Sequence, residues 1–210
     1  FELGNDGMIY SFGGYDPGWL NTCYKYDVNA NTWTPLANIP TPVWECTAAK
    51  APNGNIIVFG GENAMNLVQI YDPVLNTWST GTPLPVSVRM HSAITAPNGK
   101  IYIIGGWNGS TAINNVQIYD PVLDSWTTGT PLPNPRNQFG SCLGPDGKIY
   151  IIGGKNNGGN NSGPFYNFTD IYDPANDTWA TGTALPVTIG ETEAVTINGG
   201  INLFGGTGGT

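Results

Sequence analysis

The chain has 210 residues and a formal net charge of −8, and charged residues make up only 10% of it. No apolar stretch approaches the roughly 20 residues that a membrane-spanning helix needs. Lysine and arginine nowhere form a cluster, which argues against a nucleic-acid-binding or anionic-membrane surface. We therefore expect one soluble domain over residues 1–210, with no nucleic-acid partner, no membrane span and an acidity that serves solubility.

A unit of about 45–52 residues recurs along the chain, and a period of this size is the sequence sign of a radial all-β array. Each unit has an apolar run that ends in Gly-Gly, then a loop, a Tyr-Asp pair and a Trp seven residues after the Tyr. The Gly-Gly pairs start at Gly13, Gly60, Gly105, Gly153 and Gly205, and the Tyr–Trp pairs are Tyr26–Trp33, Tyr71–Trp78, Tyr119–Trp126 and Tyr172–Trp179.

Four short strands are predicted in a complete unit. In the third unit they cover residues 92–96, 100–105, 115–119 and 125–128. The residues 101–104 are apolar without alternation, so both faces of that strand should be covered. The units themselves span residues 1–38, 39–85, 86–133, 134–186 and 187–210, and the last contains only the first two strands.

The turn residues predict how the strands are joined. Asn-Gly or Asp-Gly between the first two strands predicts a two-residue type I′ hairpin, in which both central residues have positive φ. These pairs are Asn53-Gly54, Asn98-Gly99 and Asp146-Gly147. After the third strand, Asp120-Pro121 predicts a turn in which the Asp side chain bonds its own backbone.

The spacings separate a constant framework from one variable loop. From each repeat Trp to the next Gly-Gly the step is 27, 27, 27 and 26 residues, whereas from the second Gly to the next Tyr it is 12, 10, 13 and 18. The constant distance between Tyr and Trp predicts that the two rings pack on each other or on the neighbouring unit. We therefore assign the four Trp to the structural repeat and expect function in the variable loops.

The pattern of apolar strand, Gly-Gly, Tyr-Asp and Trp, with Arg89 or Arg136 ahead of the first strand, resembles the kelch repeat over nearly the whole chain. The resemblance implies a β-propeller with four-stranded blades. The arginine of the motif stands only in the third and fourth units, because Val43-Trp44 and Ile189-Gly190 take its place in the second and fifth. Any role that the family gives this arginine extends only to Arg89 and Arg136.

Counting strands gives four complete blades and half of a fifth. The resemblance implies a ring of six or seven blades, which often closes by joining N- and C-terminal strands in one blade. In this chain the predicted first blade already uses all its strands, starting with an inner strand at 1–4, so no N-terminal strand is left to complete the half blade. We expect either a ring completed within a longer polypeptide or an open half-blade at 187–210 that pairs with another chain.

Candidate ligand-binding residues gather on one face of such a propeller. The variable loops and the connections between blades emerge together, and the loops carry aromatic residues, including Phe165, on an Asn- and Gly-rich background that suits sugar stacking or protein docking. Charged residues at the start of the inner strands, Glu193 among them, can converge on the axis, where they bind a ligand or form internal salt bridges. The candidates are Tyr15, Trp19, Trp44, Glu45, Arg89, His91, Trp107, Arg136, Tyr166 and Glu191.

Enzymatic interpretations have little support. A copper oxidase of the kelch type needs several histidines, and His91 is the only one in the sequence. A sialidase-like site needs an arginine cluster. A hydrolase could pair Glu45 with Glu191 or Glu193 across the axis, but no spacing requires it. We therefore expect no catalytic residue, no cofactor and no metal, and keep the hydrolase as a minority alternative.

Three cysteines and four glycosylation sequons bear on the compartment. Cys23, Cys46 and Cys142 are an odd number without a metal-ligand spacing, so we expect buried free thiols, with one disulfide as the alternative. Scarce lysine and the sequons favour an exported protein, although a chain rich in Asn and Thr produces such sequons by chance. The sequons are at Asn108, Asn160, Asn167 and Asn176. The sequence begins with neither a signal peptide nor a Met, so we expect the N-terminus at Phe1 to be processed or truncated.

The sequence thus predicts a non-catalytic propeller, extracellular or at the cell surface, that binds a glycan or a protein through its variable loops. The alternative is an assembly protein whose incomplete last blade pairs with other copies of the chain into oligomers or filaments.

Overall fold

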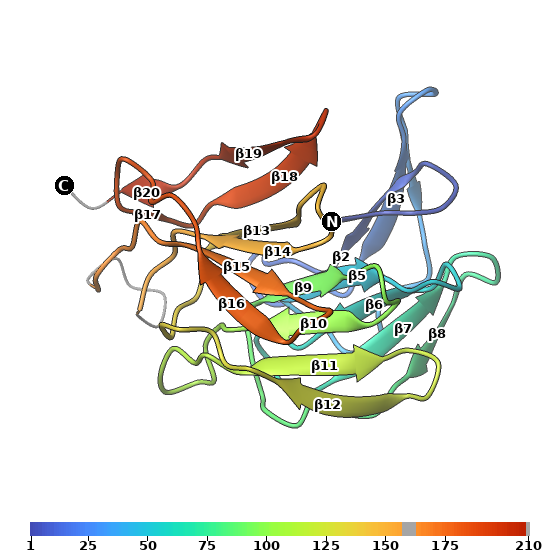
Figure 1. The fold of residues 1–210 in the computed structure, drawn as a ribbon. Coiled ribbons are helices and arrows are strands. Elements are labelled where there is room, and N and C mark those ends of the chain that lie inside the picture. Colours follow the sequence, from blue (N-terminus) through green and yellow to red (C-terminus); the bar gives the residue numbers. More distant parts are fainter. Residues whose placement is uncertain (157–162, 209–210) are drawn as a thin grey trace.

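The computed structural model describes residues 1–156 and 163–208, and these form four antiparallel four-stranded sheets in which the strands follow one another in chain order. We call each sheet a blade (Figure 1). Blade 1 contains β1 (Glu2–Leu3), β2 (Ile9–Phe12), β3 (Cys23–Asp27) and β4 (Thr32–Pro35); blade 2 contains β5 (Thr47–Lys50), β6 (Ile56–Phe59), β7 (Val68–Asp72) and β8 (Thr77–Thr80); blade 3 contains β9 (Ser92–Thr95), β10 (Ile101–Ile104), β11 (Val116–Asp120) and β12 (Ser125–Gly129); blade 4 contains β13 (Gly140–Leu143), β14 (Ile149–Ile152), β15 (Thr169–Asp173) and β16 (Thr178–Thr181).

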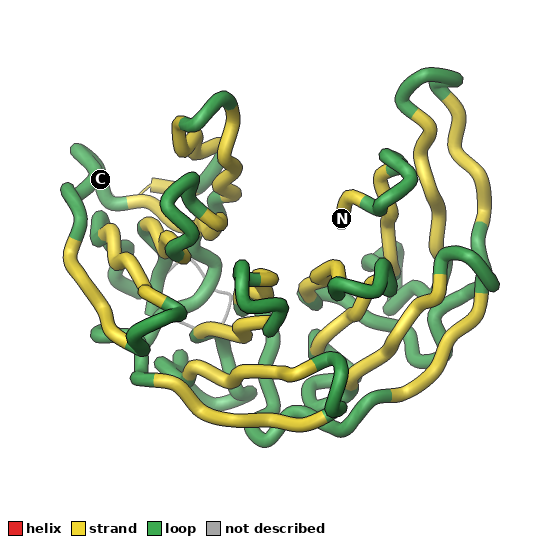
Figure 2. The backbone as a smooth tube through the Cα atoms, turned by 45° about the vertical axis from the view of Figure 1, so that its right-hand side comes forward, coloured by secondary structure: helices red, strands yellow, loops and turns green. Residues whose placement is uncertain are grey.

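The last unit is half a blade. It has a hairpin of β18 (Glu193–Ile197) and β19 (Gly200–Phe204), and a short pair of β17 (Ile189–Gly190) and β20 (Thr207–Gly208). Figure 2 shows the blades around a common centre in an open arc, with the chain ends on the two sides of the opening. The expected all-β propeller of four blades and a half blade is confirmed.

The core lies between successive blades. All four residues of β6 and of β10 are buried, which agrees with the prediction that apolar strands without alternation are covered on both faces. The corresponding strands of the terminal units, β2 and β19, are only partly buried, because each has a blade on one side only.

The repeat Tyr and Trp pack against each other in every complete blade, with ring centroids 4.8–5.0 Å apart. The indole Nε1 of Trp78, Trp126 and Trp179 also donates to a backbone carbonyl of the preceding blade, at Ala37, Thr82 and Thr130 respectively. The Trp is therefore a structural tie between blades, as its constant spacing predicts.

The Gly-Gly pair ends the second strand where the next blade approaches. Gly60 has a φ of 54°, and a Cβ atom there would lie 2.3 Å from the carbonyl oxygen of Val88. The amide of Gly61 donates to that same oxygen at 3.0 Å. Only glycine combines this left-handed backbone with this close approach.

The predicted type I′ hairpins are wrong for the three Asn-Gly and Asp-Gly pairs. Gly54, Gly99 and Gly147 have positive φ, but the residues before them do not. The amide of Gly99 donates to the carbonyl of Ala96, which defines a type I turn followed by a glycine bulge. The turn starts one residue earlier than predicted, so that Pro97 is its first central residue, a position of type I turns that a φ near −65° fits. The first unit forms the same turn without a proline, because the amide of Gly7 donates to the carbonyl of Gly4.

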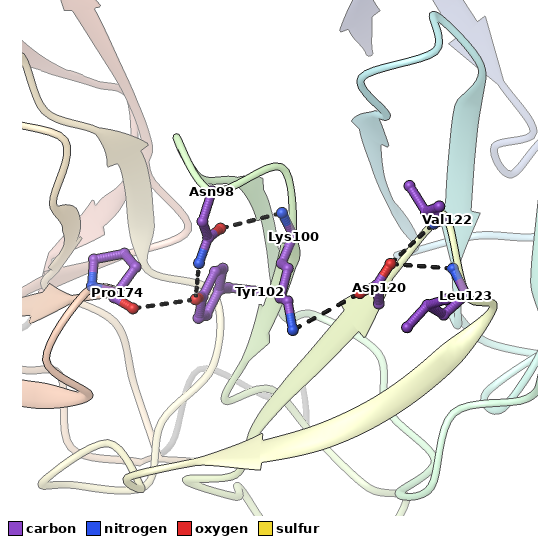
Figure 3. A network of polar contacts seen from close by, with 7 residues as sticks. All are labelled: Asn98, Lys100, Tyr102, Asp120, Val122, Leu123 and Pro174. Atoms are coloured by element: carbon purple, nitrogen blue, oxygen red, sulfur yellow. Dashed lines mark hydrogen bonds and ion pairs between the residues drawn. The ribbon is translucent and has the colours of Figure 1, made fainter.

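Side chains reinforce these turns (Figure 3). Asn98 accepts a hydrogen bond from the amide of Lys100 at 3.1 Å and donates to the Tyr102 hydroxyl at 2.8 Å. Asp120 accepts bonds from the amides of Val122 and Leu123, as predicted for the turn after the third strand. These interactions lie on the face opposite to the variable loops, which we call the hairpin face.

All three cysteines are free thiols, so the disulfide alternative is excluded. Cys23 and Cys142 are buried, and burial raises the pKa of the Cys23 and Cys46 thiols to about 11. Such thiols stay protonated and unreactive at neutral pH.

Candidate functional site

The loop face carries the leading segment of each blade, just before its first strand, beside the residue that follows the Gly-Gly pair. Single bridges join Trp44 to Glu62, Arg89 to Trp107 and Asn137 to Lys155, and the pairing of Gly190 with Thr207 repeats this arrangement in the half blade. Blades 2 to 4 and the half blade thus each present two paired positions, and the residues at these positions differ from blade to blade.

A chain of backbone hydrogen bonds links the leading segments around the axis. The amide of Met90 donates to the carbonyl of Glu45, that of Gln138 to Met90, and that of Glu191 to Gln138, at 2.6–3.2 Å. All four residues have φ between 50° and 58°, an unusual conformation for residues other than glycine. The resulting strain is offset by a ladder that fixes Glu45 and Glu191 on the loop face.

Arg89 joins two carboxylates from the second unit. Its Nη1 bonds Glu45 Oε2 and lies 3.4 Å from Glu62 Oε2. The side chains of Arg89 and Glu45 are mostly buried, and burial raises the pKa of Glu45 against the opposing effect of the Arg89 charge. The cluster places one exposed carboxylate, Glu62, beside Trp44.

Lys155 forms a second ion pair on the other side of the axis. Its buried Nζ lies 2.5 Å from Glu191 Oε1 and 5.9 Å from the centre of the Phe165 ring. Glu191 also accepts a bond from Thr207, and the bonds from Lys155 and Thr207 lower the pKa of Glu191. The two axial carboxylates proposed for a hydrolase are therefore each engaged by a cation from another unit.

Glu62 and Lys155 were missed by the sequence argument. Each directly follows a Gly-Gly pair, at the position that Tyr15 and Trp107 occupy in their own units. The variation of this single position between otherwise similar units was the signal that could have identified them.

Three of the predicted aromatic residues form an exposed group, which we call the aromatic patch. Tyr15, Trp19 and Trp44 are 56%, 47% and 39% exposed. Tyr15 forms a bridge with Trp19, and its ring centre lies 5.2 Å from that of Trp44. The patch combines the variable loop of blade 1 with the leading segment of blade 2.

A hollow of about 240 Å³ lies beside the patch, between the first two blades. Trp44 and Glu45 form one wall and Phe12 and Gly14 form part of the other. Its size suits a single side chain or a sugar ring, and its walls offer an aromatic surface next to a carboxylate.

The remaining predicted aromatics are less available. Trp107 is half-buried and bridges Arg89 and Ala112. Tyr166 is half-buried and stacks on Phe168 with ring centres 5.0 Å apart. Both lie on the loop face, but neither forms a ring contact with the three residues of the aromatic patch.

Arg136 does not correspond to Arg89. It follows its repeat Trp by ten residues, as Val88 does, whereas Arg89 follows Trp78 by eleven. Arg136 is completely buried inside blade 4, where its Nη2 donates to Asp170 at 2.6 Å and its Nη1 donates to the carbonyl of Asn134. It therefore holds the blade together and does not reach the open part of the loop face.

In blades 2 and 3 a glutamine makes the corresponding contact. Gln69 bonds both the amide and the carbonyl of Thr41, and Gln117 bonds those of Val86. Asp170 stands at this position in blade 4 and has no donor when ionised. Arg136 supplies the missing donor.

His91 and Glu193 also lie apart from the aromatic patch. His91 is buried between blades 2 and 3, with Nε2 2.7 Å from Thr47 Oγ1, and burial lowers its pKa to about 3. It is neutral at physiological pH. Glu193 starts β18, and burial raises its pKa.

The sequons differ in accessibility. Asn108 is exposed in a loop and caps the turn at Ser110 and Thr111. The side-chain Nδ2 of Asn167 donates to the carbonyl of Leu185, as that of Asn114 does to Leu132 one blade earlier. The Asn167 side chain therefore stabilises the fold. Asn176 is exposed and bonds Asp173, and Asn160 lies outside the described residues.

These features define a repeat propeller with a chemically distinct loop face. The family model described as the KLHDC2/KLHL20/DRC7 Kelch-repeats domain matches residues 3–208. The chain therefore belongs to the kelch-repeat family, and its propeller is of a kind suited to protein interaction. No curated protein matches the sequence. In the part of the chain that the structure describes, no helix is long and apolar enough to span a bilayer.

Proposed function

We propose that this propeller binds a partner protein through the aromatic patch and the adjoining hollow. The observation that carries the proposal is that Tyr15, Trp19 and Trp44 are exposed and lie in contact with one another on the loop face. Tyr and Trp dominate the energetics of protein interfaces, because their rings bury large areas with little loss of side-chain entropy.

The charges beside the patch favour a basic group on the partner. Glu62 and Glu45 lie next to Trp44, and the net charge of the chain is −8. The cations of this face, Arg89 and Lys155, already form ion pairs with carboxylates of their own chain. A lysine or arginine side chain in the hollow would gain both a carboxylate and an aromatic surface.

The test is alanine substitution within the aromatic patch, followed by capture of partners and titration of the strongest one. The variants Trp19→Ala and Trp44→Ala should each weaken binding by about tenfold or more, the effect of a hot-spot residue. Val122→Ala is the matched control, because Val122 is 84% exposed on the hairpin face. Unchanged affinity in both Trp variants, with intact thermal unfolding, contradicts the proposal.

A glycan is the alternative ligand of the same patch, because exposed aromatic rings also stack on sugars. A glycan array distinguishes the two. Binding to one sugar class that is lost in Trp44→Ala would identify a carbohydrate ligand in place of a protein.

An extracellular or cell-surface location accompanies this proposal. It is supported by the exposed sequon at Asn108. Expression in a secreting host followed by glycosidase treatment tests it, since a glycan at Asn108 would lower the mobility of the wild type and not of Asn108→Gln.

Assembly of the chain with itself is a second candidate role. It is favoured by the outer edge of β19, which has no strand beside it among the described residues, and by the exposed Val195, Ile197 and Phe204 in the same hairpin. Pairing of two such edges would give a dimer. Native mass measured over a wide concentration range tests this role.

A further inference from the structure

The hairpin face has a hollow at each boundary between two complete blades. Each hollow is lined by the hairpins that join the first two strands of the two blades, and by the turn after the third strand of the later blade. The volumes are about 270 Å³ between blades 1 and 2, 570 Å³ between blades 2 and 3, and 340 Å³ between blades 3 and 4. Because the arrangement recurs at all three boundaries, it is a property of the repeat.

Blades 3 and 4 each place a lysine of their own in this hollow. Lys100 Nζ lies 3.8 Å from Asp120 Oδ2, which belongs to the turn of the same blade (Figure 3). Lys148 Nζ lies 3.9 Å from Asp173 Oδ2 in blade 4. Both pairs line their hollows. In these blades the carboxylate at the start of the turn is therefore paired with a cation of the chain itself.

Blade 2 has the carboxylate but not the lysine. Asp72 stands at the position of Asp120, whereas Asn55 stands at the position of Lys100. Oδ1 of Asp72 accepts bonds from two amides of its own turn, at 2.8 and 3.0 Å. The ion pairs of the described residues include none with Asp72. The hollow between blades 1 and 2, which we call the blade 2 hollow, thus has an acidic rim without a cation.

Polar side chains line much of the blade 2 hollow. Asn5 and Asp6 come from the hairpin of blade 1, and Asn53 and Asn55 come from that of blade 2. The other two hollows have a proline at the position of Asn5. Among the described residues none bonds the side chains of Asn5 and Asn55. Their amide oxygens are free to accept hydrogen bonds, so the hollow suits a cation with several donors.

An aliphatic rim adjoins these polar groups. Pro73 and Val74 form the third wall of the blade 2 hollow, and Val74 and Leu75 are 89% and 69% exposed. The Asp72 carboxylate binds the amides of Val74 and Leu75, so the rim is ordered before any partner arrives. In blade 4 alanine and asparagine occupy the same two positions. The turn therefore does not require an exposed aliphatic pair.

The turns of the hairpin face carry most of the negative charge of the chain. They hold eight carboxylates and two lysines, which gives a net charge of −6 out of −8. The carboxylates are Asp6, Asp27, Asp72, Asp120, Asp124, Asp146, Asp173 and Asp177, and the lysines are Lys100 and Lys148. Such a surface attracts cationic partners and repels anionic ones.

We propose that the blade 2 hollow binds an arginine side chain of a partner polypeptide, with aliphatic residues on both sides of that arginine. The guanidinium takes the place that Lys100 has in blade 3. It donates to the carboxylate of Asp72 and to the amide oxygens of Asn5 and Asn55, while the flanking residues cover the aliphatic rim at Val74. Arginine fits better than lysine, because its donors lie in a fixed plane and can reach several acceptors at once.

A second copy of the chain cannot supply this arginine. Arg89 forms an ion pair with Glu45, and Arg136 is completely buried. The occupant is therefore a different polypeptide. The site lies on the face opposite to the aromatic patch, so it is a second interaction surface and does not depend on the function proposed above.

The experiment titrates the full, isotope-labelled chain with a blocked synthetic peptide, Gly-Leu-Arg-Leu-Gly, and follows side-chain amide signals by NMR. We expect saturable shifts of the Asn5 and Asn55 signals. One control peptide has citrulline, a neutral analogue, in place of arginine, and another has serine in place of both leucines. Each should bind at least about fivefold more weakly, through loss of the ion pair or of the aliphatic contacts.

Variants of the chain test the same contacts from the other side. Asp72→Asn keeps the acceptor of the turn but removes the charge, and Asn55→Lys introduces the lysine of blades 3 and 4. Each should weaken peptide binding by about fivefold. Asp120→Asn makes the same change in blade 3, where Lys100 is the partner, and should leave peptide binding unchanged. Thermal unfolding checks that all three variants remain folded.

The outcomes separate this site from the aromatic patch. Shifts at the blade 2 hollow that are weakened by Asn55→Lys support the proposal. Shifts at Trp44 and Glu62 instead would overturn it, because the arginine would then bind on the loop face. Equal affinity of the arginine and citrulline peptides, unchanged affinity in both Asp72→Asn and Asn55→Lys, or no shift at all would also overturn it.

Discussion

The indole Nε1 of Trp126 donates a hydrogen bond of 2.9 Å to the carbonyl oxygen of Thr82, which belongs to the preceding blade. Trp33 has the same place in blade 1, packs on Tyr26 in the same way and is 53% exposed, with no hydrogen bond from its indole to a described residue. Substitution of the two residues therefore separates two contributions to the free energy of unfolding: the hydrogen bond between blades and the packing of the ring.

Trp126→Phe should lower the free energy of unfolding by about 1–2 kcal/mol, through one lost hydrogen bond and some lost packing. Trp33→Phe should change it by less than about 0.5 kcal/mol. Urea unfolding measures both. Equal losses of unfolding free energy in the two variants would show that the hydrogen bond to the preceding blade contributes nothing to stability.

The buried pair of Arg136 and Asp170 gives a second prediction. Arg136→Ala should destabilise the protein by about 3–5 kcal/mol, because it leaves the Asp170 carboxylate buried without its cation. The double variant Arg136→Val with Asp170→Gln restores the residues found in blade 3, Val88 and Gln117.

We expect the double variant to unfold within about 1 kcal/mol of the wild type, because the glutamine amide can donate to Asn134 in place of the arginine. Denaturant unfolding of the two single variants and the double variant forms a complete cycle. A double variant as unstable as Arg136→Ala would contradict the equivalence of the two arrangements.

His91 should make stability depend on pH in weakly acidic solution. Its pKa is lowered to about 3 in the folded protein by burial, against about 6.5 when unfolded. Between these values the unfolded chain binds the additional proton, so the stability contributed by neutral His91 is present above pH 6.5 and is lost as the pH falls. From pH 7 to pH 5 the loss is about 2 kcal/mol.

His91→Phe, which places the residue of the equivalent position Phe139, should flatten this part of the profile. Carboxyl groups with shifted pKa values titrate in both proteins, so the difference between the two profiles isolates the histidine. Parallel profiles between pH 7 and pH 5 would show that His91 protonates as readily in the folded state as in the unfolded one.

Two glycines at the same place in the repeat should differ in their tolerance to substitution. A Cβ atom at Gly153 would lie 2.5 Å from the carbonyl oxygen of Ile189, whereas at Gly205 it would meet open space, and both residues have positive φ. Gly153→Ala should cost about 3 kcal/mol or more through clash and strain, and Gly205→Ala about 1–2 kcal/mol through strain alone. Thermal unfolding of the pair gives the comparison, and similar losses would refute the role of the next blade.

Local features were predictable because they repeat with the chain. The contact of Tyr119 with Trp126 follows from a constant separation of seven residues, and the Asp120 turn follows from the chemistry of Asp before Pro. The error in the hairpins was also local. Pro97 before Asn98-Gly99 was visible in the sequence, and it favours a type I turn in which proline is the first central residue.

The place of Arg136 could have been read from its distance to Trp126. It is ten residues, as for Val88, and not eleven, as for Arg89. The motif of the family drew attention to the residue type, whereas the burial of a side chain depends on its register relative to the framework.

The sequence by itself determined the blade, its strands and the Tyr and Trp residues of the core, because these depend on periodicity and on contacts that every unit repeats. Only the tertiary structure decided which side chains meet on the loop face, such as Arg89 with Glu45 and Lys155 with Glu191. These partners come from different units. A repeat period predicts that the units stack, but it does not predict which of their variable positions lie within bonding distance. The ladder of backbone bonds from Glu45 to Glu191 sets that distance, and it exists only when the blades are assembled.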